Sequence, residues 1–223
     1  MENRRLSKKL LSLISLVVLL IIGLWAWSNK WEIHDRWVSK SYSPTKDSSE
    51  VLSNLNLTAK GDLVYRASLT EVDDKDKFRQ RCPVQAYEQA SVLGCYGNRK
   101  IYVLKIDGPK LAGVEEVTAA HELLHAKFER MDGSEKKRIG VLVNALRKKI
   151  TDKETINLIN NYQNNLGTGE ELNNEMFAIF GTQLEDVGQD LENIYKDYFK
   201  DRASIVGKYF SYNSEFQRLN NVI

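Results

Sequence analysis

The sequence is poor in the residues that build disulfide-rich, collagenous and low-complexity proteins. Among its 223 residues there are two Cys, three Pro and 13 Gly, whereas 42% are hydrophobic and 28% are charged. A chain with this balance can bury a hydrophobic core and is neither a disulfide scaffold nor a disordered polymer. Its length allows one domain with an appendage, or at most two small domains. The composition therefore predicts a globular protein.

The sequence also lacks a strong charge of either sign. The formal net charge is +2; residues 1–30 hold five Lys or Arg and one Glu, and the remainder holds 27 basic and 29 acidic residues. The part able to fold is thus slightly acidic. Because nucleic-acid binding depends on a basic patch or stripe, we expect no nucleic-acid partner.

One long apolar run lies close to the N-terminus. From Leu10 to Trp27 there is no charged residue, and a helix of that length spans about 27 Å, close to the thickness of a bilayer's hydrocarbon core. We therefore predict a transmembrane signal anchor over residues 10–29, with the lipid bilayer as a partner. A cleaved signal peptide is the alternative, because Ala26-Trp27-Ser28 loosely resembles a cleavage site, although the apolar cores of such peptides are shorter, about 7–15 residues.

The charges beside this run predict its orientation. Four basic residues precede it, whereas the segment after it mixes Lys and Arg with Glu and Asp. The positive-inside rule then keeps residues 1–9 in the cytoplasm and places the rest of this single-pass protein outside it. Three tryptophans, Trp25, Trp27 and Trp31, are typical of an aromatic belt at the outer membrane interface.

The segment after the membrane helix resembles a spacer. Residues 38–56 are polar and rich in Ser, a composition typical of linkers. Residues 30–56 are therefore interpreted as a stalk or linker, and residues 57–223 as the exported domain.

The exported part predicts a small sheet followed by helices. Gly61–Leu69 has strand composition, Asp73–Arg81 indicates a short polar helix or turn, and Ser91–Cys95 and Lys100–Ile106 flank Gly97-Asn98 as the strands of a hairpin. Beyond the hairpin the pattern is helical to the C-terminus. The predicted fold class is α+β, with a small N-terminal sheet or hairpin before a mainly helical region.

Both cysteines, Cys82 and Cys95, lie in the exported part, where a disulfide can persist. We expect them to pair, which would add about 3 kcal/mol by restricting the unfolded chain. Two free buried cysteines are the alternative in a reducing compartment. Their spacing is not that of a CxxC motif, which argues against a metal or redox role.

The stretch His121-Glu122-Leu123-Leu124-His125 carries the chemistry of the sequence. Residues four apart lie on one face of a helix, so the imidazoles of His121 and His125 can bind one cation. Glu122 lies beside them, where a general base would act on water. This is the HExxH pattern, in which two His bind zinc. The alternative is that both imidazoles are core side chains with polar partners.

A catalytic zinc ion has three protein ligands and one open position. The only other histidine, His34, is next to the membrane helix, so an acidic third ligand is expected. Glu175 lies within an apolar helical stripe, and an inward carboxylate costs several kcal/mol unless it is paired or bound to a metal. We predict Glu175 as the ligand and Glu171 as the reserve, with a salt bridge from Glu175 to a Lys or Arg as the alternative.

The HExxH motif, followed by Asn174-Glu175-Met176-Phe177-Ala178, resembles the gluzincin class of zinc metallopeptidases, whose third ligand is a Glu on a later helix. The resemblance covers roughly residues 100–180. It implies a zincin-like fold, Zn²⁺ bound by His121, His125 and Glu175, and Glu122 as the residue that activates water. The spacing departs from thermolysin-like members, which place the Glu closer to the second His; here the separation is 50 residues.

The resemblance also implies how substrate is bound. In gluzincins the strand before the motif helix pairs with the main chain of a peptide or protein substrate. In this sequence that strand is Lys100–Ile106, and Tyr102, Val103 and Leu104 are the implied substrate-binding residues.

Large side chains recur with alternating spacings of four and three between residues 191 and 219. The pattern predicts a helix that crosses its own domain, with a coiled coil as the alternative. Tyr195, Tyr198 and Arg202 on this face are candidate donors to the oxyanion of a tetrahedral intermediate.

Taken together, these patterns predict a membrane-anchored zinc endopeptidase with an extracytoplasmic catalytic domain. In this hypothesis Glu122 takes a proton from water and passes it to the leaving amine. The alternative hypothesis is a non-catalytic exported binding or scaffold module, in which a metal is structural or absent.

Overall fold

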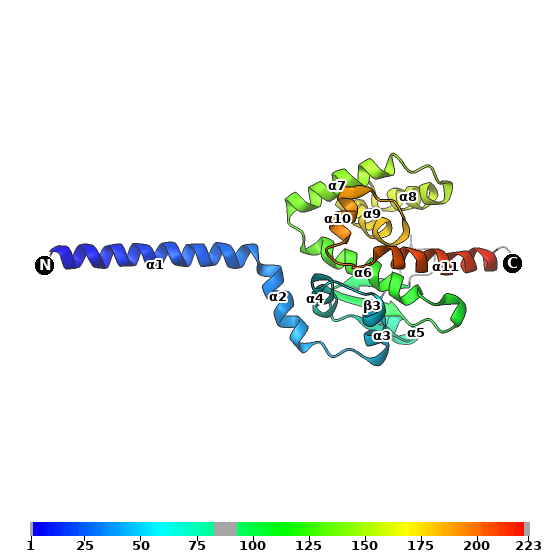
Figure 1. The fold of residues 1–223 in the computed structure, drawn as a ribbon, viewed down its shortest axis with the longest axis horizontal. Helices are drawn as coiled ribbons and strands as arrows, with labels where there is room; N and C mark the ends of the chain where they lie inside the picture. Colours follow the sequence, from blue (N-terminus) through cyan, green and yellow to red (C-terminus); the bar gives the residue numbers. More distant parts are fainter. Residues whose placement is uncertain (1, 83–92, 221–223) are drawn as a thin grey trace.

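A single long helix, α1 (Glu2–Ser28), projects away from the rest of the chain in the computed structural model, which describes residues 2–82 and 93–220 (Figure 1). Its segment Leu11–Ser28 has a mean hydropathy of 2.3, and none of it is buried. By length and composition this helix can cross a membrane. The prediction of an apolar helix of membrane-spanning length is confirmed.

The segment predicted as a stalk is folded. Helix α2 (Lys30–Val38) follows α1 after one residue, and a 3-10 turn, η1 (Ser39–Ser41), leads to α3 (Lys46–Asn54). Val51 and Leu55 are core residues, 2% and 1% exposed. The prediction of a linker over residues 30–56, with the domain starting at residue 57, is therefore wrong.

The polar residues of this segment cap a helix and bind the backbone of the domain, which explains why the segment is folded. Thr45 caps α3 by accepting a hydrogen bond from the backbone N–H of Ser48. The Ser48 hydroxyl in turn accepts one from the N–H of Val72, and its carbonyl accepts one from the hydroxyl of Tyr65. A Ser-rich composition is shared by linkers and by capped, hydrogen-bonded helix ends, so composition alone does not distinguish them.

Residues 61–67 of the predicted first strand, Gly61–Leu69, belong instead to helix α4 (Ala59–Ala67). Thr58 accepts a hydrogen bond from the N–H of Gly61 and caps the helix. Gly61 also permits close packing, because a Cβ there would overlap the backbone carbonyl of Tyr198. The N-cap and this helix-to-backbone contact outweigh the strand-like composition of Gly61–Leu69.

Three strands form one sheet in the described residues: β1 (Glu71–Asp73), β2 (Gly94–Gly97) and β3 (Lys100–Leu104), in the order β1-β3-β2. Strands β2 and β3 are antiparallel around a turn at Asn98 and Arg99, which confirms the hairpin, whereas β1 pairs with β3 in parallel. Ser91 and Val92 of the predicted hairpin lie outside the described residues.

A short helix, α5 (Lys75–Arg81), precedes the hairpin in the chain and confirms the helix expected there. It ends at Cys82, which forms a disulfide with Cys95 of β2. The predicted pairing is therefore confirmed, and it ties the end of α5 to β2.

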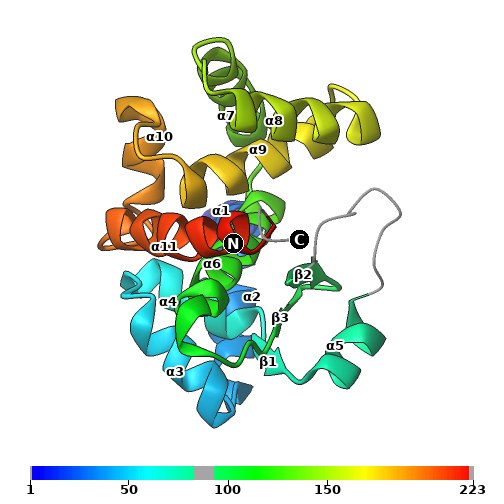
Figure 2. The same ribbon diagram turned by 90° about the vertical axis from the view of Figure 1, so that its right-hand side faces the viewer.

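After a 3-10 turn, η2 (Pro109–Leu111), the chain is helical to the end of the described region. Helix α6 (Val114–Arg130) runs through the middle, with α2 to α5 and the sheet on one side and α7 to α10 on the other (Figure 2). The helices of the second group are α7 (Gly133–Arg147), α8 (Lys153–Leu166), α9 (Glu170–Gln183) and α10 (Gly188–Tyr195).

The last helix, α11 (Arg202–Asn220), packs against α6 and α9. The pattern predicted as one helix over residues 191–219 is thus divided between α10 and α11, with Phe199 of the connection forming a β-bridge to Leu57. The aromatic face contacts its own domain, as expected. The fold is mainly helical with a small sheet, consistent with the predicted α+β class.

Candidate metal centre

Helix α6 carries polar side chains into the interior of a packed domain. Its first turn holds Glu115 and Glu116 and its last turn holds Lys127 and Arg130. These charges interact favourably with the helix dipole at each end. Three small residues, Ala119, Ala120 and Ala126, are fully buried. They let neighbouring elements approach α6 closely, α9 among them.

Three predicted ligands converge between α6 and α9. The Nε2 atoms of His121 and His125 lie 3.0 Å apart. The Nε2 atom of His121 lies 3.4 Å from Oε1 of Glu175, and that of His125 lies 3.4 Å from Oε2. The three side chains are 18%, 13% and 15% exposed, so the cluster is recessed but reached by solvent.

These separations fit a metal ion. In a tetrahedral site with bonds of about 2.0–2.1 Å, ligand atoms lie about 3.3–3.4 Å from one another. The distances of 3.0, 3.4 and 3.4 Å between the three side chains are close to that value. The group can therefore hold a metal ion with little movement.

A neighbouring amide orients one of the imidazoles. Oδ1 of Asn174 lies 3.0 Å from Nδ1 of His125. An amide oxygen only accepts, so Nδ1–H of His125 is the donor and its Nε2 atom presents a lone pair toward His121 and Glu175. The residue next to Glu175 in sequence thus sets the tautomer of a second member of the cluster.

Glu175 is held as an anion. Burial raises the pKa of its carboxyl, but the hydrogen bond from His121, favourable electrostatic interactions with both imidazoles and a hydrogen bond from Tyr162 of α8 outweigh burial and lower the pKa to about 2. These partners, rather than a Lys or Arg, surround the carboxylate in the described part of the chain. Glu171, the reserve ligand, is exposed and lies outside the cluster.

Glu122 lies on the side of α6 that faces the sheet. It is 6% exposed, and a Cβ added to Gly94 of β2 would come within 3.0 Å of its Oε1 atom and would overlap the methyl group of Thr118. Strand β2 therefore passes directly against α6 at Glu122. Glycine at position 94 is what permits this approach.

The predicted substrate-binding strand is wrong. Tyr102, Val103 and Leu104 belong to β3, which is the central strand; Val103, for example, pairs with Val72 of β1 and with Gly94 of β2. Both backbone edges of β3 are thus occupied. Within the described sheet, β2 is the edge strand next to α6.

The predicted oxyanion donors are engaged elsewhere. The hydroxyl of Tyr195 is buried and donates to the carbonyl of Phe177 at 2.8 Å. The guanidinium of Arg202 binds Glu192 and the carbonyls of Leu184 and Glu185, just beyond the C-terminal end of α9. Both residues fasten helices together, and assigning them to the oxyanion is wrong.

The third candidate, Tyr198, is 1% exposed, and the ammonium groups of Lys60 and Lys127 lie over its ring. Lys127 is two residues from His125, which places it on the opposite face of α6. Tyr198 therefore packs away from the cluster. The residue that sequence reasoning missed is Tyr162, one of ten Tyr in the chain, and no motif distinguishes it.

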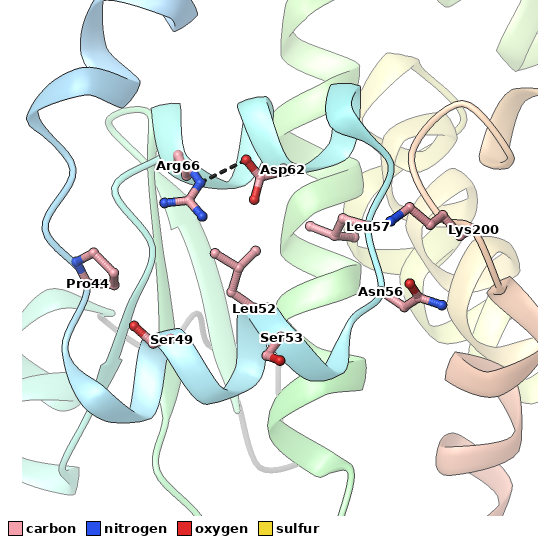
Figure 3. Close-up of a pocket in the computed structure, with 9 residues that line it drawn as sticks. All are labelled: Pro44, Ser49, Leu52, Ser53, Asn56, Leu57, Asp62, Arg66 and Lys200. Atoms are coloured by element: carbon pink, nitrogen blue, oxygen red, sulfur yellow. Dashed lines mark hydrogen bonds and ion pairs between the residues drawn. The ribbon is translucent and has the colours of Figure 1, made fainter.

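A separate hollow of about 420 Å³ lies beside α3 and α4 (Figure 3). Its lining includes the ion pair of Arg66 with Asp62, 2.8 Å apart, together with Ser49, Ser53 and Lys200. It contains no member of the His121, His125 and Glu175 cluster. Arg66 and Asp62 pair with each other and Lys200 is exposed. The candidate metal ligands of the described residues lie on α6 and α9 instead.

Comparison of this chain with protein-family models, with curated proteins and with solved structures found no match.

Proposed function

We propose that this protein is a zinc-dependent endopeptidase. The observation that carries the proposal is the convergence of His121, His125 and Glu175, which lie on two helices and up to 54 residues apart in the chain, at separations close to those of a tetrahedral site. Glu122, the glutamate of the HExxH motif, lies on α6 next to His121. The arrangement matches what the resemblance to gluzincins implies.

The donor set is compatible with zinc, and the HExxH motif that supplies two of the donors favours zinc over the non-haem iron that also binds two His and one carboxylate. Two imidazole nitrogens and one carboxylate form a set used by catalytic zinc sites, which keep a position open, whereas structural zinc sites are closed by four ligands, often Cys. Both cysteines of this chain are in the disulfide and are not available as ligands. The site is therefore suited to catalysis rather than to structural zinc.

The residues around the site have distinct roles in the proposed reaction. A zinc ion bound here would supply Lewis acidity, which activates water and polarises a carbonyl group. Glu122 takes a proton from the attacking water and delivers it to the leaving amine. Glu175 contributes negative charge, Asn174 holds His125 in the required tautomer, and the 13–18% exposure of the three ligands leaves a route for the substrate.

Strand β2 is the element suited to hold a peptide. An extended chain can add to the edge of a sheet by main-chain hydrogen bonds, and β2 (Gly94–Gly97) is the edge strand that passes Glu122. A substrate aligned on β2 would bring its backbone close to the general base. This assignment replaces the central strand β3.

The proposed location is the outer face of a membrane. Helix α1 has the length and hydropathy of a membrane anchor, and the basic residues before it favour a cytoplasmic N-terminus. The disulfide between Cys82 and Cys95 supports an oxidising, extracytoplasmic compartment for the folded part. The substrates proposed are peptides or proteins outside the cytoplasm.

The deciding experiment compares the full-length protein with Glu122→Gln. The variant is expected to keep one zinc per chain, measured by metal analysis, and to lose peptide cleavage. Glu171→Gln is the matched control, because Glu171 is an exposed carboxylate one turn from Glu175, and it should keep both metal and activity. Cleavage that survives Glu122→Gln would contradict the mechanism. Zinc binding without cleavage by the unaltered protein would instead favour the non-catalytic module.

A further inference from the structure

Helix α2 links the membrane helix directly to the folded domain. Asn29 is the only residue between α1 and α2, and the chain turns there, so that α1 and the domain lie on opposite sides of α2 (Figure 1). The sequence predicts a flexible stalk in this region. The structure has a nine-residue helix instead.

The inner face of α2 is fixed to the end of α6. Asp35 is 3% exposed and accepts hydrogen bonds from Nε and Nη2 of Arg130, at 2.7 and 3.0 Å. The ring of Trp31 packs against the guanidinium groups of Arg130 and Arg99, with centroid distances of 5.6 and 4.8 Å. The prediction of Trp31 as part of a membrane belt is therefore wrong, because this ring faces the domain.

The outer face of α2 carries large apolar side chains with no cover in the described residues. Trp37 is 75% exposed and Ile33 is 44% exposed. Both lie across the helix from Asp35, because residues two apart on a helix point in nearly opposite directions. They form a pair one turn apart, and Lys30 and the ion pair of Arg36 with Glu32 are exposed beside them.

This combination is characteristic of a helix that lies in a membrane interface. Such helices present Trp and aliphatic residues on one face, with Lys and Arg beside it. Trp37 lies nine residues beyond Ser28, at most about 14 Å along a helix from the end of the membrane helix. The face that carries Trp37 therefore stays within reach of the bilayer that α1 would cross.

We propose that α2 is an interfacial helix whose face of Ile33 and Trp37 lies in the outer headgroup region of the bilayer. The inference rests on the proposed membrane anchoring through α1. Because the opposite face of α2 is joined to α6 by the buried pair of Asp35 with Arg130, the domain lies about one helix diameter, 10–12 Å, from the membrane. The metal centre on α6 is then held in one orientation relative to the bilayer.

The test measures the surroundings of Trp37 in the full-length protein, reconstituted in phosphatidylcholine vesicles. A background with Trp25→Phe and Trp27→Phe leaves Trp31 and Trp37 as the two tryptophan emitters. The emission removed by a further Trp37→Phe change is then that of Trp37. We expect lipids brominated near the headgroup to quench most of it and aqueous acrylamide to quench little.

A matched control places a Trp at another exposed apolar position. Phe210 is 46% exposed and belongs to α11, a helix on the side of the domain away from α1 (Figure 1). In the same background with Trp37→Phe added, the emission gained by Phe210→Trp should be quenched by acrylamide and unaffected by brominated lipid. The contrast between positions 37 and 210 separates membrane contact from simple exposure.

The possible failures are distinguishable. Protein that does not float with the vesicles would overturn the anchoring on which the inference rests. Protein that floats while acrylamide quenches Trp37 would overturn the interfacial helix alone. Shielding of Trp37 that grows with protein concentration in detergent, without lipid quenching in vesicles, would overturn it in favour of a second copy of the chain as the occupant.

Discussion

Helix α6 takes part in two polar clusters that differ in how their groups are satisfied. At its C-terminal end, Arg130 donates to the carboxylate of Asp35 and to the carbonyl of Ala126, so positive and negative charges are paired. Further back along the helix, His121 and His125 direct nitrogen atoms toward each other and toward the oxygens of Glu175. The first cluster is a complete ion pair, whereas each member of the second has an atom that can bind a metal ion.

The two clusters also differ in access. The side chains of Asp35 and Arg130 are each 4% exposed, whereas those of the His and Glu cluster are 13–18% exposed. A sealed, neutralised pair joins two elements of the fold. A recessed but accessible group of potential metal ligands is suited to bind a cation. Burial of polar residues alone therefore does not identify a site; the chemistry and the access of the groups do.

Removing a member of the open cluster should have the largest effect on function. Glu175→Ala leaves two of the three proposed ligands, so the protein is expected to lose stoichiometric zinc and all measurable peptide cleavage. Metal analysis and a cleavage assay check this. Because the three side chains are partly exposed, 13–18%, and the substitution buries no unpaired charge, the thermal unfolding of the metal-free variant should change little from that of the metal-free parent. Retention of zinc would show that Glu175 is not a ligand.

Removing a member of the closed cluster should instead affect stability. Asp35→Ala leaves the charge of Arg130 buried without its partner, which typically costs 3–5 kcal/mol, so we expect a loss of about that size in unfolding free energy. Denaturant unfolding with metal analysis of the folded fraction checks it, and zinc stoichiometry should not change. Glu32→Ala is the control, since its pair with Arg36 is exposed. Loss of zinc in the folded Asp35→Ala protein would show that the two clusters are coupled.

The side-chain amide of Asn174, next to Glu175 in sequence, tests how the orientation of His125 affects metal binding. Asn174→Ala removes the acceptor that orients His125, and such changes typically weaken metal binding by about 10–100-fold. Asn173→Ala is the matched control, because the amide of Asn173 contacts Asn144 of α7 rather than an imidazole. Zinc affinity measured by competition with a chelator should fall only for Asn174→Ala. Equal losses in both variants would indicate a general change in α9.

The smallest expected effect is at Tyr162. Tyr162→Phe removes one hydrogen bond to Glu175 and leaves the ring in place. A hydrogen bond to a charged group typically contributes about 1.5–3 kcal/mol. A bound metal would itself neutralise the carboxylate, so we expect the lower end of that range, about a tenfold loss of zinc affinity, with folding preserved. The same chelator competition measures it. An unchanged affinity would show that the hydroxyl does not support the carboxylate once a metal is bound.

Local spacing explains which parts of the site the sequence could predict. The four-residue interval between His121 and His125 places both imidazoles on one helix face in any helical context. Glu175 was identifiable because an acidic residue interrupts an apolar stripe. Tyr162 carried no such signal: its contact with Glu175 depends on how α8 packs against α9, which neither helix's own pattern specifies.

The incorrect sequence-based predictions have the same cause: contacts between elements that are distant in the chain. The Ser-rich segment looked like a linker because its hydrogen-bond partner, Val72, is 24 residues from Ser48. Tyr195 and Arg202 looked available because their acceptors are on other elements, at Phe177 and beyond the end of α9. Strand β3 looked accessible because the short parallel strand β1 that covers its other edge has only three residues.

The sequence by itself determined the apolar membrane-length helix, the paired imidazoles and the hairpin, because each depends on spacing or composition within one continuous segment. The tertiary structure alone decided which tyrosine contacts the carboxylate of Glu175, which strand edge is covered and which face of α2 is attached to the domain. Those features depend on contacts between elements distant in the chain. Such contacts arise from packing and hydrogen bonding across the whole domain, and no local pattern encodes them.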